Sequence, residues 1–290
     1  MTEFDLEQIK AIADPAARAK AAGELLNAHQ AYVTRLASIR REAIAELRAS
    51  GLSYAQVAEA LGVSRGRIAQ LRAPPLEIEY EFFGGKIVAI TTPLRTSGLA
   101  RPVIAHEDFA AATSLARFLE TFDIETTMHQ VAPTGEVDFS APALVAICGP
   151  KSSPVIRDLI AADPVLDFSP DDDGQWRILE RGSGRAFSSP IDENGGDADF
   201  AYVARLHRPD GRPFIVIAGI HAIGSLGAVH FLTRASNLHE LHRRVGTQPF
   251  SMVVSSSFKR SPLQITSSAY AAEPLLHAEA SDEQRPSRQA

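Results

Sequence analysis

Two adjacent prolines, Pro74 and Pro75, separate two stretches of this chain that have different residue patterns. Proline has no backbone N–H and a fixed φ, so the pair ends a preceding helix and stiffens the chain that follows. Before the prolines, apolar residues recur at helical spacing, and after them short apolar runs alternate with helical patterns. The pattern predicts a helical domain over residues 1–73, a linker over 74–85 and an α/β domain over 86–272.

A single long helix is predicted over residues 14–50. Asp14 can act as its N-cap, Pro15 fits the first helical position, and Gly51 can adopt the left-handed conformation that follows a helix. Two interpretations of this helix are open: a scaffold under the helices that follow, or a dimerisation helix. Its apolar residues recur mostly three and four positions apart: Leu25, Leu26, Tyr32, Val33, Leu36, Ile39, Ile44 and Leu47.

The next segment is predicted to form two short helices joined by a tight turn. Ser53 and Gln56 have the spacing of a capping box, which begins the first helix. Gly62 lies where the turn needs a positive φ, and Ser64 can cap the second helix. The small residue Ala58 allows the two helices to cross closely. We expect one small core of five apolar side chains: Val57, Leu61, Val63, Ile68 and Leu71.

The start of the second short helix carries residues of the kind that read DNA. Arg65, Arg67 and Gln70 are predicted to face outward, and arginine and glutamine can pair with guanine and adenine in the major groove. Gly66 has no side chain, which permits close approach to a DNA backbone, and Ser64 caps this turn. Further arginines are expected to contact phosphates: Arg40, Arg41, Arg48 and Arg72.

The stretch GLSYAQVAEALGVSRGRIAQLRA, residues 51–73, resembles the helix-turn-helix of region 4 of bacterial sigma factors. It matches the capping serine, the alanine, the turn glycine and the pattern Arg-x-Arg-Ile/Val-x-Gln of that family, and the resemblance extends weakly back to about Ala13. It implies that this first quarter of the chain binds double-stranded DNA. The family's promoter-core region has no visible counterpart, so a sigma factor is not expected. The alternative is a helical hairpin used only for protein contacts.

The net charge of −6 is unusual for a DNA-binding protein, but the charge is unevenly distributed. Residues 1–73 hold 10 of the 29 Lys and Arg residues and only 8 of the 35 Asp and Glu residues. The acidic excess therefore belongs to the rest of the chain. DNA affinity depends on the local basic surface, so the negative total does not exclude DNA binding.

The second part of the chain has the pattern of a Rossmann-like α/β domain with a mostly parallel sheet. Continuous apolar strands between helices are typical of a sheet that is covered on both faces. The tail over 273–290 is polar and is expected to be disordered. Strands are predicted at 86–92, 143–148, 200–206, 213–218 and 250–257, helices at 106–122, 154–162 and from 222, and a hairpin at 176–179 and 185–188.

Two loops in this domain pass from a predicted strand into a predicted helix. Helix N-termini at the carboxyl ends of strands suit phosphate or carboxylate groups, so the two loops together predict a cleft for a small anionic or nucleotide-like ligand. The alternative is that their glycines serve only turns and close packing. The first loop contributes Gly149, Lys151, Ser152 and Ser153. The second contributes Gly219, His221, Gly224 and Ser225.

The chain contains no complete catalytic or metal-binding motif. Ser225 stands where a P-loop needs lysine, and neither loop has the spacing of a dinucleotide fingerprint. Cys148 ends a buried strand and is expected to be an inert thiol. His239 and His242 lack the spacing of a zinc protease motif and are expected on a solvated helix face. We therefore expect a binding protein without a cofactor, apart from a nucleotide or phosphate-containing ligand.

Taken together, the patterns predict a cytoplasmic bacterial transcription regulator that binds DNA as a homodimer and senses a small anion. The acidic start of the chain lacks the order of a signal peptide, and no apolar run is long enough to cross a membrane. A single cysteine excludes an internal disulfide. Two alternatives remain: a nucleotide-processing enzyme or defence-type effector that its helix-turn-helix tethers to DNA, and an α/β module that recruits a protein.

Overall fold

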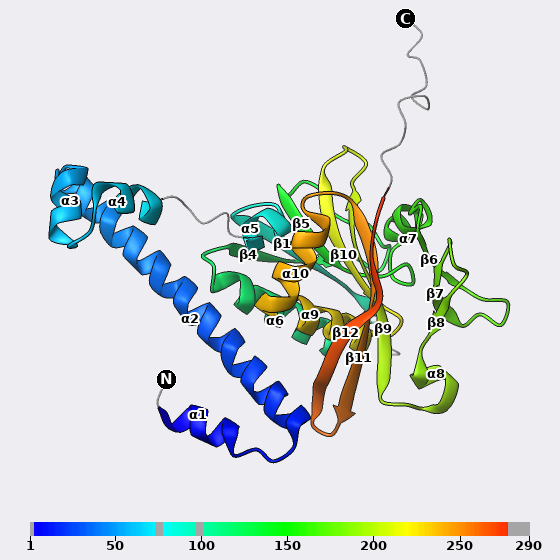
Figure 1. Ribbon diagram of the computed structural model, residues 1–290. Coiled ribbons are helices and arrows are strands. Elements are labelled where there is room, and N and C mark those ends of the chain that lie inside the picture. The colour runs from blue at the N-terminus through cyan, green and yellow to red at the C-terminus, as the bar shows by residue number, and fades with distance from the viewer. Residues whose placement is uncertain (1–2, 73–77, 97–100, 278–290) are drawn as a thin grey trace, which may run out of the picture.

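The computed structural model describes residues 3–72, 78–96 and 101–277 (Figure 1). It begins with a short helix, α1 (Glu3–Lys10), which the sequence analysis did not predict, and the long helix α2 (Pro15–Ala49). The Asp14 side chain accepts hydrogen bonds from the backbone N–H groups of Ala16 and Ala17, and a proline occupies the first turn. The predicted long helix and its cap are therefore confirmed.

Two short helices, α3 (Tyr54–Ala60) and α4 (Arg65–Arg72), follow α2. Both hydrogen bonds of the predicted capping box are present, and Gly62 has a φ of +65° in the turn between the helices. Ser64 Oγ accepts the backbone N–H of Arg67 at 3.1 Å, as expected for an N-cap. Leu61 does not join the core as predicted, because it is 42% exposed at the end of α3. The buried core consists of Ile44, Val57, Ala58 and Ile68.

The stretch expected as a linker over 74–85 contains a helix, α5 (Ile78–Phe83). Phe82 and Phe83 are buried against the second domain, and residues 73–77 lie outside the described residues. The buried guanidinium of Arg205 donates a hydrogen bond to the Phe82 carbonyl at 3.1 Å and lies over the Phe82 ring. Since α5 packs in the core of the second domain, it is part of that domain and not a linker.

The second domain is built around a seven-stranded sheet in the order β12-β11-β9-β10-β5-β1-β4. The four adjacent strands β4, β1, β5 and β10 are parallel to one another. Strand β11 runs in the same direction as these four. β9 and β12 run in the opposite direction, so the sheet is mixed but mostly parallel, as predicted. The strands are β1 (Ile87–Pro93), β4 (Glu125–Val131), β5 (Ala143–Ile147), β9 (Ala198–His207), β10 (Pro213–Gly219), β11 (Phe250–Arg260) and β12 (Leu263–Leu276).

Two of these strands were not predicted from the sequence. β4 has an exposed, polar pattern at one edge of the sheet, and β12 forms the other edge. β12 includes the residues from Glu273 to Leu276, which were expected to belong to a disordered tail. Residues 278–290 lie outside the described residues. The ordered domain therefore extends beyond the predicted boundary at 272.

Helices and a small second sheet cover the two faces of the main sheet. One face packs against α5, α6 (His106–Glu120), α9 (Ala222–Leu232) and α10 (Ala235–Val245). The other packs against α7 (Pro154–Ala161) and the three-stranded sheet of β6 (Leu166–Pro170), β7 (Trp176–Glu180) and β8 (Ala186–Ser188). The predicted hairpin is confirmed as β7 and β8, while β6 was missed. Smaller elements are β2 (Arg95–Thr96), β3 (Pro102–Val103) and α8 (Pro190–Asn194).

The long helix α2 joins the two domains. Its first turns lie beside the β11–β12 turn, where Lys20 Nζ donates a hydrogen bond to the Thr266 carbonyl at 3.0 Å. From there α2 runs away from the turn and carries α3 and α4 at its far end (Figure 1). Within the described ranges, no helix combines the length and apolar content that crossing a membrane requires.

Candidate functional site

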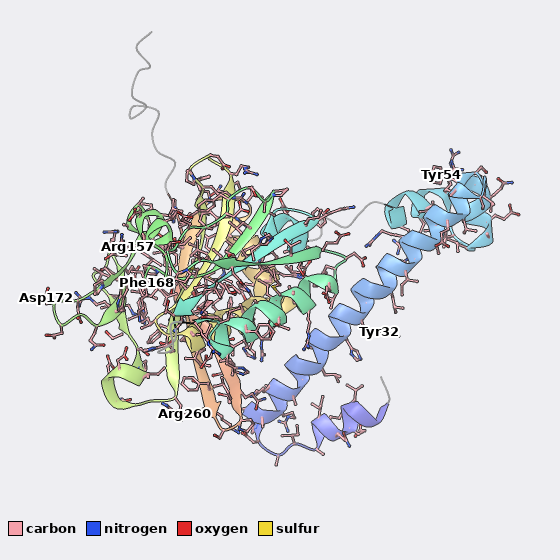
Figure 2. The ribbon with its side chains drawn as sticks, turned by 180° about the vertical axis from the view of Figure 1, so that it is seen from behind. Tyr32, Tyr54, Arg157, Phe168, Asp172 and Arg260 are labelled. Carbon is pink, nitrogen blue, oxygen red and sulfur yellow. The ribbon has the colours of Figure 1, made fainter. Side chains whose placement is uncertain are left out.

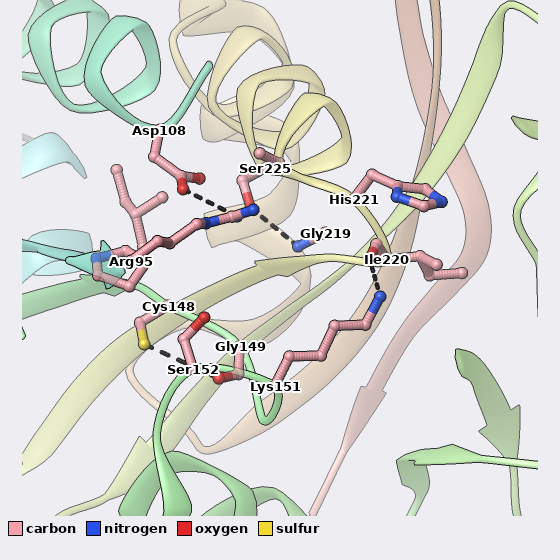
Figure 3. Close-up of a pocket in the computed structure, with 13 residues that line it drawn as sticks. Arg95, Asp108, Cys148, Gly149, Lys151, Ser152, Gly219, Ile220, His221 and Ser225 are labelled. Carbon is pink, nitrogen blue, oxygen red and sulfur yellow. Dashed lines mark hydrogen bonds and ion pairs between the residues drawn. The ribbon is translucent and has the colours of Figure 1, made fainter. Parts of the chain in front are cut away.

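A pocket of about 310 Å³ opens at the carboxyl ends of three adjacent parallel strands, β1, β5 and β10 (Figure 3). After β1, the chain crosses through α6 to β4 on one side, and it returns to β5 on the other side of β1. The carboxyl edge beside such a change of direction is where open α/β sheets usually bind ligands. The pocket therefore lies at the position that the two predicted loops indicated.

Six of the eight predicted ligand-binding residues line this pocket. They are Gly149, Lys151, Ser152, Gly219, His221 and Ser225. Ser153 does not line it, because its buried hydroxyl donates to the Gly135 carbonyl at 2.5 Å and caps α7. Gly224 does not line it either. A Cβ on Gly224 would lie 2.5 Å from Asp199 Oδ2, so this glycine allows α9 to pack closely on the sheet. For Gly224, the packing interpretation is the correct one.

Two further charged residues, Arg95 and Asp108, line the pocket and were not predicted from the sequence. Arg95 follows β1, and its Nη2 lies 3.2 Å from Asp108 Oδ2 in the first turn of α6. Figure 3 shows the Arg95 side chain extended across the pocket towards Asp108. Burial raises the pKa of Asp108 to about 6, although Arg95 acts in the opposite direction.

Lys151 brings a second cation to the pocket. Its ammonium donates a hydrogen bond to the Ile220 carbonyl at 2.6 Å and lies 5.5 Å from the centre of the Trp176 ring. Burial lowers the pKa of Lys151, since withdrawal from water disfavours its charged form. The pocket is therefore lined by two cationic side chains, Arg95 and Lys151, and Trp176 lies close to Lys151.

His221 is held in place at the start of α9. Its backbone N–H donates to Asp199 Oδ2 at 2.9 Å, and its ring Nε2 lies 3.0 Å from both carboxylate oxygens of Asp192. Burial raises the pKa of Asp199. Ser225, one turn into α9, accepts the backbone N–H of Gly219 at 2.9 Å. These contacts fix the loop between β10 and α9, so the His221 ring is oriented before any ligand binds.

The remaining candidates for chemistry have structural explanations. Cys148 is buried, and burial raises the pKa of its thiol to about 12, which fits the expected inert thiol. His239 and His242 are not on a purely solvated face as expected, because they pair with Glu79 at 2.8 Å and Glu81 at 3.1 Å of α5. In the part of the chain that the structure describes, no cluster of His, Cys, Asp or Glu has the arrangement of a metal site.

The second candidate surface is formed by α4 and the end of α2. Arg65, Gly66 and Arg67 are exposed in the first turn of α4 behind the Ser64 cap, and Arg40 of α2 is also exposed. Arg41 is half-buried. Arg48 instead lies 4.2 Å over the Tyr54 ring and donates to the Leu52 carbonyl. The side chains of Gln70 and Arg72 lie outside the described residues.

Comparisons with known proteins add no assignment to either surface. The chain matches no family model, and no similar curated protein or solved structure was found. The two candidate surfaces therefore rest on their own chemistry.

The buried carboxyl of Asp108 predicts a distinctive pH dependence of stability. Its pKa is about 6 in the folded protein against an ordinary 3.8, so between these values the folded state binds more protons than the unfolded state. The contribution of Asp108 to the free energy of unfolding should therefore fall by ~2 kcal/mol as the pH rises from 4 to 6. We expect Asp108→Asn to remove this fall.

Urea denaturation of both proteins at several pH values measures the effect. The exposed Asp158 serves as a control position, because Asp158→Asn should leave the profile unchanged. Parallel profiles for the wild type and Asp108→Asn between pH 4 and 6 would contradict the role assigned to this carboxyl.

Proposed function

We propose that this protein is a DNA-binding transcription regulator whose second, Rossmann-like domain senses a small anionic ligand. In this proposal, α3 and α4 form a helix-turn-helix, and α4 enters the major groove of double-stranded DNA. The observation that carries the proposal is the exposed first turn of α4. There, Arg65 and Arg67 flank a glycine behind a serine cap, and no acidic residue is present in the helix.

The size and packing of α4 support this use. The helix has eight residues, which corresponds to roughly 12 Å, and the B-DNA major groove is about 12 Å wide. Ile68 is buried on the side that faces α2 and α3, so the core holds one face of α4 and leaves Arg65 and Arg67 outside. The first turn can therefore approach base edges without unfolding of the hairpin.

The residues divide into two proposed roles. Arg65 and Arg67 read base edges, together with Gln70 as predicted from the sequence, while Gly66 permits close approach and Ser64 caps the turn. Arg40 and Arg41 contact phosphates, as does Arg72 by prediction. Arg48 contributes less directly, since its guanidinium already stacks on Tyr54.

We expect Arg67→Ala and Arg40→Ala to affect DNA binding in different ways. Loss of a base contact should weaken binding to the preferred duplex by ~1–3 kcal/mol and relax the preference at one position. Loss of a phosphate contact should weaken all sequences alike and reduce the salt slope by about 1. Fluorescence anisotropy with labelled duplexes at several salt concentrations separates the two.

Arg157→Ala is the matched control for this experiment. Arg157 is an exposed arginine on α7, which lies on the opposite side of the molecule from Tyr54 and α3 (Figure 2). This control should bind like the wild type. An Arg67→Ala variant that keeps both affinity and sequence preference would refute the assignment of α4 as the reading helix.

The proposed partner on α2 is a second copy of this chain. Five apolar side chains in the middle of α2 are each between 50% and 70% exposed: Leu26, Tyr32, Val33, Leu36 and Ile39. Tyr32, Leu36 and Ile39 are separated by four and then three residues along the helix. Leu26 and Val33 are seven residues apart, which is two helical turns. This is the pattern of a helix–helix seam. Figure 2 shows Tyr32 on the part of α2 between the second domain and α3.

The extent of this seam suits a dimer. At roughly 100 Å² for each half-exposed side chain, the five residues offer about 500 Å² per protomer, which approaches the size of a specific interface when both copies are counted. A patch of this size is comparable with the largest apolar patch of a typical monomer, and such patches often mark interaction surfaces. Pairing through α2 would also place two copies of α4 on one DNA duplex, as helix-turn-helix dimers require.

Leu36→Glu should convert this dimer into monomers. Leu36 is exposed in one chain, so the substitution should not unfold the protein, but in the dimer it would bury an unpaired charge. Sedimentation velocity at about 10 μM measures the change. Phe109→Glu, at an exposed phenylalanine of the second domain, is the control and should stay dimeric. A wild type that remains monomeric at ~100 μM would contradict the proposal.

The ligand proposed for the sheet pocket is a small anion with a phosphate or carboxylate group. Arg95, Lys151 and the start of α9 all present positive charge or N–H donors to the pocket. The volume of about 310 Å³ is at the lower end of small-molecule sites. Binding there changes the surroundings of Trp176, the one tryptophan of the chain.

Trp176 fluorescence therefore tests the pocket directly. A panel of nucleotides, sugar phosphates and carboxylates should contain at least one compound that changes the fluorescence saturably in the wild type. Lys151→Ala should weaken that binding at least tenfold, because the pocket loses one of its two cations, Arg95 and Lys151, and Arg157→Ala should not. No saturable change with any compound, or undiminished binding by Lys151→Ala, would contradict the anion pocket.

A further inference from the structure

We propose a second anion site, separate from the sheet pocket, in a cavity of about 460 Å³ between the start of α2 and the second domain. Its ligand class is a phosphate-bearing polyanion. The basic side chains that line it are Lys20, His230, Arg234 and Lys259. This proposal rests on the chemistry of the cavity and does not depend on DNA binding by α4.

The cavity collects basic side chains from elements that are far apart in the sequence. Lys20 comes from the second turn of α2, His230 from α9, and Arg234 from the residue that precedes α10. Lys259 lies near the end of β11, and Gln264 and Thr266 of β12 add polar groups. Of the described residues that line the cavity, none is an aspartate or a glutamate.

Among the described side chains, no carboxylate pairs with the cations of this cavity, Lys20, Arg234 and Lys259. Other arginines of the same region are paired: Arg244 with Glu240 and Glu273, and Arg260 with Asp197. An arrangement of like charges without a counter-charge is unfavourable in one chain and favours an anion from solution.

The surroundings of His230 give separate evidence for positive charge in this cavity. The Nε2 atom of His230 lies 3.1 Å from Nη2 of Arg234. Because a guanidinium can only donate hydrogen bonds, this Nε2 atom is the acceptor. The proton of the neutral ring is then on Nδ1, which donates to Ser268 Oγ at 2.8 Å. Burial, followed by the charges of Arg234 and Lys20, lowers the pKa of His230 to about 4. Burial and the neighbouring positive charges both favour the neutral imidazole.

The volume of this cavity, about 460 Å³, suits a small ligand. Lys20 lies near the start of α2, whereas α3 and α4 lie at its far end (Figure 1). A helix of 35 residues is about 50 Å long, so most of the length of α2 separates this cavity from α3 and α4. Three cations match a ligand with two or more negative charges, such as a diphosphate group.

An anion in this cavity would connect α2 to the second domain. Lys20 belongs to α2, while Arg234 and Lys259 belong to the second domain, so one polyanion would contact both. The Lys20–Thr266 hydrogen bond already holds the two together without a ligand. A polyanion that binds this closed arrangement better than an open one would stabilise the direction in which α2 projects.

The test is isothermal titration calorimetry of the full chain with inorganic pyrophosphate at constant ionic strength. Both proteins compared carry Lys151→Ala, which weakens the sheet pocket. The protein with this change alone should bind pyrophosphate, and the double variant Arg234→Ala with Lys259→Ala in the same background should bind at least tenfold more weakly. Lys259→Ala alone removes a cation whose side chain makes no ion pair among the described residues, so it should keep the fold and still weaken binding. Lys151→Ala, in the sheet pocket, should retain this binding event.

Two further measurements show at which of the two sites pyrophosphate binds. The NMR signal of the His230 ring should shift during the titration, and the fluorescence of Trp176 should not change in the Lys151→Ala background. Undiminished pyrophosphate affinity in the double variant, no binding in the low millimolar range, or equal competition by sulfate would overturn the proposal. So would a loss of duplex DNA affinity in the double variant as large as that of Arg67→Ala, because the cations would then serve DNA phosphates.

Discussion

The parallel alignment of β1, β5 and β10 is the constraint on which the sheet pocket depends. Parallel neighbours end at the same edge, so Arg95, Lys151 and His221 meet there although they are far apart in the sequence. Helix α9, whose first residues line the pocket, packs closely on the sheet. Gly224 and Gly227 allow α9 to approach Asp199 and Ser256 more closely than any side chain would permit. The pocket is therefore a consequence of the topology and not of a local motif.

The long helix α2 determines how the parts of the molecule act together. One end contacts the second domain at the basic cavity, the middle presents the apolar seam, and the other end carries α3 and α4. In the proposed regulator, an anion at either site of the second domain would affect DNA binding by changing how α2 projects or pairs. This requires different affinities for two arrangements of α2, which is the condition for any allosteric effect.

Local features were predictable from the sequence, whereas contacts between distant residues were not. The capping box of Ser53 and Gln56 and the turn at Gly62 depend on neighbours within four residues. The Arg95–Asp108 pair depends on how α6 returns to the sheet, and the packing role of Gly224 on the distance to Asp199. β4 was missed because an exposed edge strand lacks the apolar run that marks buried strands. The cavity between the start of α2 and the second domain could not be predicted for the same reason, because its residues come from elements that are far apart in the sequence.

Selection of bound duplexes from a random pool by the full chain, followed by sequencing, tests the central claim most directly. The account predicts enrichment of one motif with two related half-sites, and loss of that enrichment when Arg65 and Arg67 are both replaced by alanine. A bound fraction with no enriched sequence, or the same motif from the variant without these arginines, would contradict DNA recognition by α4.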